Sequence, residues 1–259
     1  MKIVIIGGVA GGASAAARAR RLSEEAEIVI LERGDYVSFA NCGLPYHIGG
    51  DIKRRRDLLI STPEDFKENY QIEVRVGHEA TAIDREGKNV RVVERVSGRE
   101  YDEPYDKLIL SQGAAPVRPE LPGSGNPRIF VLRDIPSMDL IKELVDGGAK
   151  TAVVIGAGYI GLEVVEALVH RGLKVDLVEK EAQVLPGLDQ EMAIDLQSHL
   201  EEKGVRVRLC TGATAFYDRG GRVEVSLGGD AVGDGLGIGK GTGGDSVIAD
   251  FVLMAVGVR

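Results

Sequence analysis

One cysteine lies in a segment whose residue types suit thiol chemistry. Cys42 is followed by Gly-Leu-Pro-Tyr at positions 43–46, which predicts a helix that starts there with a proline in its first turn. A thiol at the start of a helix ionises more readily and attacks disulfides better. Asn41 and Ser38 could donate hydrogen bonds to that sulfur or to a bound thiol substrate. The alternative is a small buried cysteine that fills the core.

The second cysteine points to no chemistry of its own. Cys210 ends a strand pattern, and we interpret it as core or strand-end filling. No C-x-x-C or C-x-x-x-x-C spacing is present, so a redox disulfide within this segment is excluded. Two cysteines in 259 residues form no disulfide scaffold. A reducing cytoplasm fits best, and no metal site is expected.

Two glycine-rich turns predict two dinucleotide sites. The first is Gly7-Gly8-Val9-Ala10-Gly11-Gly12, and the second, 149 positions later, is Gly156-Ala157-Gly158-Tyr159-Ile160-Gly161. Each follows an apolar strand pattern, at 2–6 and 151–155, and precedes a helical pattern, at 13–22 and 162–171. Such a turn brings backbone N–H groups close to a pyrophosphate at the positive end of a helix.

Each turn is followed by an acid at the end of the next strand. Glu32 and Glu179 occupy the position that accepts hydrogen bonds from a ribose diol. Glu179 favours NADH over NADPH, although Lys180 beside it weakens that preference. Val9 departs from the glycine expected in the middle of the first turn, and a turn without ligand is the alternative for either site. Two such sites in one chain suggest a flavin and a nicotinamide.

Composition limits the remaining possibilities. The chain is 44% hydrophobic and 28% charged, with a formal net charge of -8, so a disordered chain is excluded. No apolar run is long enough for a membrane span, and the first residues do not resemble a secretory signal. The acidic balance argues against nucleic acid as the main partner. Small molecules are the expected partners.

The pattern along the chain predicts an α/β fold with two Rossmann-like, doubly wound, three-layer ββα nucleotide-binding domains. We predict an FAD-binding domain at 1–115, a linker and crossover at 116–147, and an NAD(P)-binding domain at 148–259. Further strands are expected at 27–31, 72–76, 80–84, 89–94, 107–110, 175–178, 206–209 and 247–256, and helices at 137–145 and 188–203. The glycine-rich stretch 228–244 is expected to be a loop joining two strands. Its Gly239-Lys240-Gly241-Thr242 lacks the Ser or Thr directly after Lys that a phosphate loop needs.

The segment at 38–46, SFANCGLPY, together with the two glycine turns, resembles the single-cysteine branch of the pyridine nucleotide-disulfide oxidoreductase family. Within that branch it is most similar to coenzyme A-disulfide reductases and NADH-dependent persulfide or polysulfide reductases. The resemblance covers the chain except 228–244. It implies a cytoplasmic, FAD-dependent NAD(P)H:disulfide oxidoreductase whose parent protein is a homodimer and whose substrate is a small disulfide or persulfide.

The resemblance also implies roles for individual residues. Cys42 would be the redox nucleophile, forming a mixed disulfide with coenzyme A, and Asn41 and Ser38 would assist it. The coenzyme A channel would be lined by Ser14, Arg18, Arg21, Ser38 and Asn41. FAD would contact Gly7, Gly8, Ala10, Gly11, Gly12, Glu32, Arg33, Asn41, Cys42, Ala80, Ser111, Gly113 and Arg133. The nicotinamide side would comprise Gly156, Gly158, Tyr159, Ile160, Gly161, Glu163, Glu179, Lys180 and Gly257. The basic run 53–56 is interpreted as a solvated face.

Three departures from the family keep alternatives open. Ala10 stands where oxygen- and peroxide-reducing relatives carry a histidine, which disfavours an NADH oxidase or peroxidase. Tyr70 stands where a family lysine approaches coenzyme A, with Lys67 one turn earlier, so a thiol disulfide in general is a firmer expectation than coenzyme A. The family continues well beyond residue 259 with a second FAD-contacting strand and a dimerisation domain. A catalytically silent nucleotide-binding fragment is therefore the alternative from another class, and an electron-transfer reductase would leave the Cys42 segment unexplained.

Overall fold

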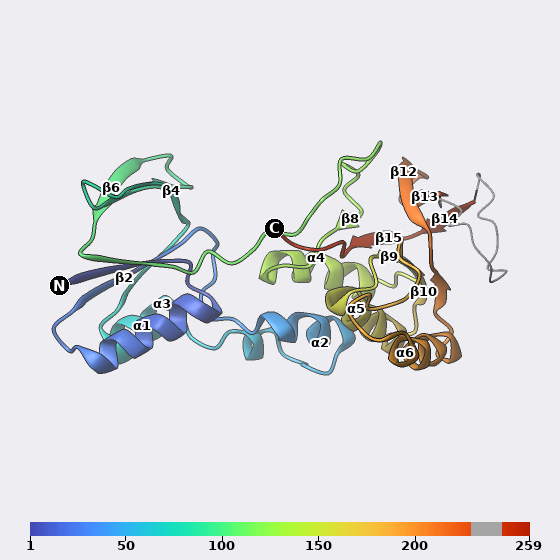
Figure 1. Ribbon diagram of the computed structural model, residues 1–259, viewed down its shortest axis with the longest axis horizontal. Coiled ribbons are helices and arrows are strands. Elements are labelled where there is room, and N and C mark those ends of the chain that lie inside the picture. Colours follow the sequence, from blue (N-terminus) through green and yellow to red (C-terminus); the bar gives the residue numbers. More distant parts are fainter. Residues whose placement is uncertain (229–244) are drawn as a thin grey trace. The chain divides into compact units, whose positions relative to one another are not determined.

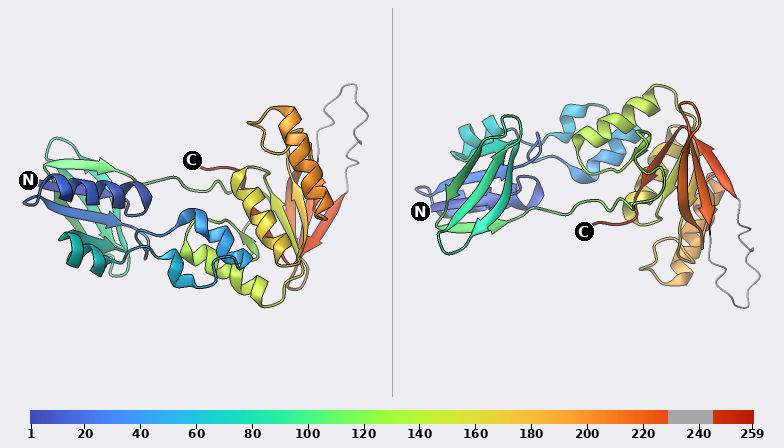
Figure 2. Two further views of the ribbon diagram at one scale, coloured as in Figure 1. Left: turned by 90° about the horizontal axis from the view of Figure 1, so that it is seen from below. Right: turned by 90° about the horizontal axis from the view of Figure 1, so that it is seen from above.

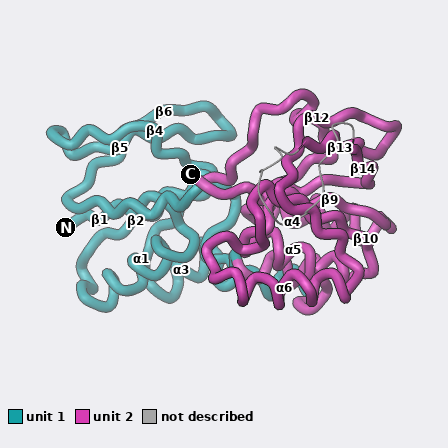
Figure 3. The backbone as a smooth tube through the Cα atoms, turned by 45° about the vertical axis from the view of Figure 1, so that its right-hand side comes forward, with its two compact units in different colours: residues 1–41, 54–114 teal, residues 42–53, 115–259 magenta. Residues whose placement is uncertain are grey.

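The computed structural model describes residues 1–228 and 245–259, which form two compact units (Figure 3). Unit 1 comprises Met1–Asn41 and Arg54–Ala114, and unit 2 comprises Cys42–Lys53 and Ala115–Arg259. The predicted loop at 228–244 lies outside the described residues, apart from Gly228, and so does the rejected phosphate-loop sequence. No helix in the described ranges is both long and apolar enough to span a bilayer.

Unit 1 is built from two sheets and two main helices. Its elements are β1 (Lys2–Ile6), α1 (Ala10–Leu22), β2 (Glu27–Glu32), a 3-10 turn (Arg55–Leu58), α3 (Pro63–Tyr70), β3 (Glu73–Val76), β4 (His78–Asp84), β5 (Asn89–Glu94), β6 (Glu100–Pro104) and β7 (Lys107–Leu110). The parallel sheet has the order β3-β2-β1-β7, and β4-β5-β6 form an antiparallel sheet. The chain therefore crosses from β1 through α1 to β2, as the first glycine turn predicts.

The parallel sheet of unit 1 is covered on both faces (Figures 1 and 2). Ile3 and Ile28 pack with the residues of α1 and with Phe66 of α3 in one apolar cluster. On the opposite face Val29 packs with Val90 and Val92 of β5. The alternation of side chains along a strand sends successive residues to opposite faces, which explains why β1 and β2 are apolar throughout. The result is a three-layer ββα unit.

Unit 2 repeats this architecture with an added strand on its sheet. Its elements are α2 (Leu44–Gly49), β8 (Ile129–Phe130), α4 (Ile135–Asp146), β9 (Thr151–Ile155), α5 (Tyr159–His170), β10 (Lys174–Val178), α6 (Gln190–Glu202), β11 (Arg206–Arg208), β12 (Gly212–Asp218), β13 (Val223–Gly228), β14 (Ser246–Ala249) and β15 (Phe251–Met254). The parallel sheet has the order β11-β10-β9-β15-β8, and β12-β13-β14 form an antiparallel sheet. The predicted fold class is confirmed in both units.

The antiparallel sheet of unit 2 covers one face of its parallel sheet. Val153 and Val252 pack with Phe216, Val223 and Val225 in one apolar cluster. Helix α5 contacts β9 and β10 on the other side, and α6 contacts β11. Each parallel sheet therefore lies between helices and a meander, a layering that buries both of its faces.

The expected single strand at 247–256 is wrong, because two strands occupy this range. β14 joins the antiparallel sheet and β15 the parallel one, and Asp250 lies between them. Its Oδ2 accepts hydrogen bonds from Lys150 N at 2.8 Å, Thr151 N at 2.9 Å and Thr151 Oγ1 at 3.0 Å. Three donors on one carboxylate fix the turn that transfers the chain from one sheet to the other.

The compact units differ from the predicted domain limits in two places. Residues 42–53 belong with unit 2, because α2 packs on α4 and α5. Residues 116–147 are part of unit 2 as well, since β8 pairs with β15 and supplies an edge of its sheet. The sequence predicted contiguous domains because it shows where the linker composition changes, whereas helix packing between distant segments leaves no such sign.

A buried carboxylate ties the two sheets of unit 1 together. Glu103 on β6 is 4% exposed and forms an ion pair with Lys2 of β1 at 2.6 Å and another with Arg75 of β3. Burial by itself would raise the pKa of the Glu103 carboxyl, but the hydrogen bonds from Lys2 and Arg75 hold it below its usual value. The carboxyl therefore stays ionised to lower pH in the folded chain than in the unfolded chain.

We expect this cluster to make unit 1 sensitive to acid. A carboxyl whose pKa is lowered in the folded state stabilises the folded chain at pH values above the ordinary glutamate pKa. That stabilisation is lost as the pH falls through the lowered pKa. Glu103→Gln should lower the free energy of unfolding at pH 7 by about 3 kcal/mol, because Lys2 and Arg75 lose their shared buried carboxylate and keep only the exposed partners Glu27 and Glu73. Urea unfolding between pH 7 and pH 3 measures both effects. Glu100→Gln, at an exposed position of the same strand, is the matched control, and equal losses in the two variants would contradict the expectation.

Candidate functional site

The first glycine turn is clamped by the acid that follows β2. Glu32 Oε2 accepts from Gly8 N at 2.8 Å, and its Oε1 accepts from Gly34 N at 2.8 Å. Gly7 N donates to Leu31 O at 2.8 Å, so the turn continues the strand pairing by one residue. The backbone N–H of Ser38 donates to Gly8 O at 2.9 Å. The carboxylate is thus fixed beside the turn, where the sequence predicted a ribose acid.

The second turn has the same bonds at matching positions. Glu179 Oε2 accepts from Ala157 N at 2.6 Å, and its Oε1 accepts from Glu181 N at 2.9 Å. Gly156 N donates to Val178 O at 2.8 Å, and Leu185 N donates to Ala157 O at 2.9 Å. Glu179 is 8% exposed. Two separate segments have therefore folded into the same carboxylate-clamped turn, each between a strand and a helix as the two motifs predicted.

The last glycine of each motif allows its helix to approach the turn. A Cβ on Gly12 would lie 1.7 Å from Gly7 O, and a Cβ on Gly161 would lie 2.0 Å from Gly156 O. No side chain fits at those distances, so both positions require glycine. Gly158 differs, because a Cβ there would meet no atom within 4 Å. The middle glycine is therefore dispensable for packing, which explains how Val9 occupies the same place in the first turn.

The two helices that follow these turns start without internal anion partners. α1 and α5 have no side-chain cap on their first N–H groups and no acid in the first turn. By contrast, α3 and α4 begin with complete capping boxes formed by Thr62 with Asp65 and by Asp134 with Ser137. α6, the remaining helix of eight or more residues in the described part of the chain, has no side-chain cap but carries an acid, Glu191, in its first turn. The uncapped N–H groups of α1 and α5 suit a phosphate group.

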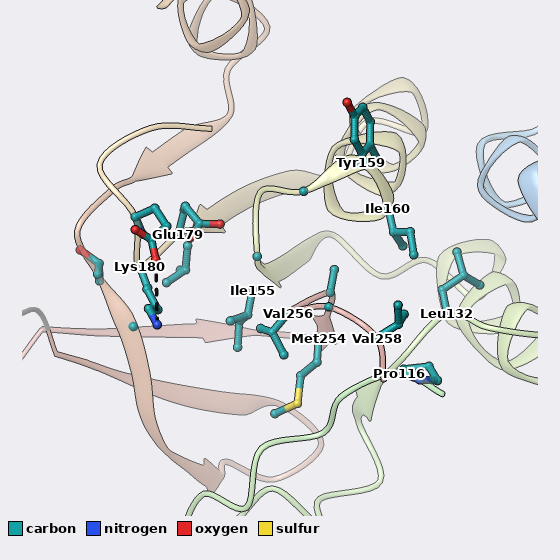
Figure 4. Close-up of a pocket in the computed structure, with 18 of the residues that line it drawn as sticks. Pro116, Leu132, Ile155, Tyr159, Ile160, Glu179, Lys180, Met254, Val256 and Val258 are labelled. Atoms are coloured by element: carbon teal, nitrogen blue, oxygen red, sulfur yellow. Dashed lines mark hydrogen bonds and ion pairs between the residues drawn. The ribbon is translucent and has the colours of Figure 1, made fainter. Parts of the chain in front are cut away.

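A cleft of about 500 Å³ opens at the second turn, at the carboxyl ends of β9, β10 and β15 (Figure 4). In an open α/β sheet this is where the strand order reverses and ligands bind. The predicted residues that line it are Arg133, Gly156, Gly158, Tyr159, Ile160, Glu179, Lys180 and Gly257. The ring of Tyr159 is largely exposed at the start of α5. The cleft has the size and lining of a cofactor site.

Two predicted residues of this group do not line the cleft. Gly161 packs against the turn instead, and Glu163 lies one turn further along α5. The lining residues that sequence reasoning missed come from strand ends and from the segments around them: Pro116, Leu132, Ile155, Val178, Glu181, Thr211, Gly212, Met254, Ala255, Val256 and Val258. The end of each predicted parallel strand was the signal that could have found Ile155 and Val178. Pro116 and Val258 pair in an isolated β-bridge, and no local sequence pattern predicts that contact.

Several predicted residues of unit 1 lie around the first turn or on α1, whereas Ala80 lies on β4 of the antiparallel sheet. Gly7 approaches Ser111, and Gly11 faces the Ser111 side chain, so the ends of β1 and β7 meet there. Ser14, Arg18 and Arg21 are exposed on α1 at helical spacing. Ala10 is the first residue of α1, and Gly113 has a φ of 69°. Arg33 O accepts from Arg95 Nη1 at 3.4 Å, and Ala80 lies at the register shift of β4.

Cys42 is exposed, which contradicts the alternative of a core-filling cysteine. It lies in a 3-10 turn, Asn41–Gly43, that leads directly into α2 with a proline in the first turn, as predicted. Asn41 belongs to unit 1, and Cys42 begins the segment that packs in unit 2. Ser38 has a φ of 46°, an unusual value for a residue other than glycine. Cys210 is half-buried after β11, and no cluster of potential metal ligands occurs among the described residues.

The geometry defines a protein with two dinucleotide-type turns and one exposed thiol at the start of a helix. The family model for pyridine nucleotide-disulphide oxidoreductases matches residues 1–259. The chain belongs to this family.

Individual relatives agree with that assignment. The coenzyme A disulfide reductase of Staphylococcus haemolyticus is 42% identical over 209 residues, which are 80% of this chain and 47% of the relative. The crystal structure of reduced Bacillus anthracis CoADR-RHD superposes with a TM-score of 0.90 at 42% identity, covering all of this chain and 44% of that one. A NAD-dependent persulfide reductase from A. fulgidus gives a TM-score of 0.90 at 34% identity, covering all of this chain and 46% of that one. The chain thus spans about half the length of these relatives.

The glycines of the second turn predict separable effects on stability and on nucleotide binding. Gly158→Ala should leave the free energy of unfolding within about 0.5 kcal/mol, since the new methyl meets no atom. It should weaken NADH binding about tenfold or more, because the methyl enters the cleft. Gly161→Ala should instead destabilise by about 3 kcal/mol through its clash with Gly156 O. Thermal unfolding and NADH titration distinguish the two, and a Gly158→Ala chain with unchanged NADH affinity would contradict this placement of the nucleotide.

Proposed function

We propose that this chain is the nucleotide-binding portion of an FAD-dependent NAD(P)H:disulfide oxidoreductase that works through Cys42. The observation that carries the proposal is the exposed Cys42 thiol at the start of α2, in the same compact unit as the nucleotide cleft. The first glycine turn, in unit 1, supplies the place for another dinucleotide. A nucleotide-binding fold without redox chemistry would have no use for the thiol.

The two turns fit two different cofactors. Unit 1 would hold FAD, with Glu32 on the adenosine ribose and the first turn of α1 on the pyrophosphate. Unit 2 would hold the nicotinamide dinucleotide, with Glu179 on its ribose and Tyr159 at the mouth of the cleft. When bound, the flavin supplies the two-electron relay between the reduced nicotinamide and the sulfur chemistry.

The protein's own part in the reaction is thiol–disulfide exchange at Cys42. The Cys42 thiolate attacks one sulfur of the substrate disulfide, the S–S bond breaks, and the first thiol leaves with a proton. A mixed disulfide between Cys42 and the other half of the substrate remains. Two electrons that originate from NADH then break this bond, which releases the second thiol and restores the Cys42 thiolate. One NADH and one proton are consumed for each disulfide reduced to two thiols.

The substrate is proposed to be coenzyme A disulfide or a related persulfide or polysulfide. The names of the relatives support this class, and so does the exposed basic face of α1, where Arg18 and Arg21 are separated by three positions. Guanidinium groups bind phosphate oxygens as forked donors, which suits the phosphates of coenzyme A. The parent protein is proposed to be a homodimer. A reducing, cytoplasmic environment would keep Cys42 available for exchange.

Two rival functions are separated by simple measurements. An NADH oxidase or peroxidase of the same family would consume NADH with oxygen or peroxide alone, and Ala10 at the first position of α1 argues against it. A silent nucleotide-binding fragment would bind NADH but purify without flavin colour.

The first test replaces the proposed nucleophile. Cys42→Ser should reduce NADH-dependent disulfide reduction about a thousandfold or more, because serine cannot form the mixed disulfide. Cys210→Ser is the matched control and should keep the activity, since Cys210 is half-buried and does not begin a helix. The flavin absorbance of the purified chain should be present in both variants. On NADH addition, a long-wavelength thiolate–flavin band should appear only where Cys42 remains. Full activity in the Cys42→Ser chain would refute the proposal.

A second test concerns the choice between NADH and NADPH. The Glu179 carboxylate is held in place by Ala157 N and Glu181 N, so a 2′-phosphate would meet a fixed negative charge. Glu179→Gln should reduce the preference for NADH about tenfold, measured as the ratio of the two dissociation constants. Lys180 is largely exposed and lies 3.9 Å from Glu181. Lys180→Ala should instead increase the preference for NADH. Equal ratios of the two dissociation constants in the unchanged chain and in both variants would show that Glu179 does not select the nucleotide.

A further inference from the structure

A single guanidinium joins three helix ends in unit 2. Arg171 follows the last residue of α5 and caps that helix. Its Nη1 donates to Ile48 O in the last turn of α2 at 3.0 Å, and its Nη2 pairs with Asp146 Oδ1 at the end of α4 at 2.7 Å. The last carbonyls of a helix have no partner within the helix, so Ile48 O gains a charge-assisted donor that α2 cannot supply.

The contact of α2 with α5 is close as well as polar. A Cβ on Gly49 would lie 3.2 Å from Ala167 Cβ, so the glycine brings the backbone of α2 against α5. Ile48 is fully buried, and His47 is 4% exposed with its Nδ1 2.6 Å from Ile52 O. Together with Leu44, which is 2% exposed at the start of the helix, these residues fix the packed side of α2.

Cys42 lies just before a helix that is packed in both of its halves, with Leu44 2% exposed at its start and Ile48 fully buried near its end. The cysteine is exposed in the 3-10 turn that continues into the six residues of α2. A helix this short is marginal without tertiary contacts, so its position is set by its buried residues, among them Leu44 and Ile48, and by the bond from Arg171 to Ile48 O. Helix α5, to which it is held, begins with Tyr159 in the nucleotide cleft.

We propose that Arg171 is a positioning residue for Cys42, holding the thiol-bearing segment on the helix whose first turn forms the nucleotide cleft. This inference builds on the proposed function, in which Cys42 is the nucleophile. Arg171 acts through α2 and touches no reacting atom. Lysine cannot replace it fully, because one ammonium group lacks the planar fork that reaches Ile48 O and Asp146 together. Lys142 also pairs with Asp146 at 3.0 Å, so that carboxylate keeps a partner when Arg171 is removed.

The test reads the position of Cys42 directly and needs no turnover. In a Cys210→Ser chain, a nitroxide label on Cys42 reports the mobility of the thiol, and hydrogen exchange reports the order of residues 44–50. Arg171→Ala should make the label markedly more mobile and should speed exchange in α2 by about tenfold. Exchange in the middle of α5 and the affinity for NADH should stay within about twofold of the unchanged chain.

Three further variants make the outcome specific. Arg171→Lys should restore part of the order, and Asp146→Asn should loosen α2 less than Arg171→Ala does, since the bond to Ile48 O remains. Arg206→Ala, which removes an exposed arginine of β11 that lies 3.5 Å from Asp176, is the charge-matched control and should leave the label unchanged. If Arg171→Ala does not fold, Arg171→Lys and Asp146→Asn carry the test.

The proposal is overturned if label mobility and α2 exchange are the same with and without the Arg171 guanidinium. These readouts are independent of disulfide reduction. An ordered Cys42 segment in a chain without reductase activity would therefore count against the proposed function and not against the role of Arg171.

Discussion

Both units depend on one steric constraint, a helix glycine lying against the carbonyl oxygen of the turn before it. At Gly12 and Gly161 any side chain would overlap that oxygen, so only glycine lets the helix start directly over the strand ends. The close start leaves the first N–H groups of α1 and α5 uncapped, and it places the turn where Glu32 and Glu179 can accept its backbone N–H groups. This one contact therefore gives each turn the geometry that the proposed phosphate and ribose sites require.

The two turns are alike in their bonds and differ in the side chains that their ligands would meet. Glu32 and Glu179 make equivalent pairs of hydrogen bonds. Ser38 and Leu185 both have a positive φ, and the backbone N–H of each donates to its turn. Where the second turn continues with Tyr159, the first continues with Ala10. A bulky ring after one turn and a methyl after the other indicate different occupants, because the scaffold that holds them is the same. This difference supports a nicotinamide site in unit 2 and a flavin site in unit 1.

The sequence predicted the parallel strands, the glycine turns and the acids because each rests on a local rule. Apolar runs such as 2–6 and 151–155 have the bounds found in the structure, and glycine at positions 12 and 161 is required by contacts only a few residues away. The rest depends on contacts between distant segments. The division of 247–256 at Asp250 follows from donors at Lys150 and Thr151, and the cleft lining at Pro116 and Val258 depends on an isolated bridge between them. The hydrophobic periodicity within one segment does not predict which distant residues it will contact.

The most consequential of these distant contacts concerns the thiol. By sequence Cys42 follows Asn41 in the first nucleotide-binding pattern, yet its segment packs with the helices of unit 2. The exposed sulfur and the cleft that would receive the nicotinamide are therefore features of one compact unit, joined by α5. A disulfide reductase must bring electrons from a nucleotide to a sulfur, and electrons pass only where the groups are held in fixed geometry. The short helix after Cys42 is marginal by itself, so its packing on α4 and α5 supplies the order that the proposed chemistry requires.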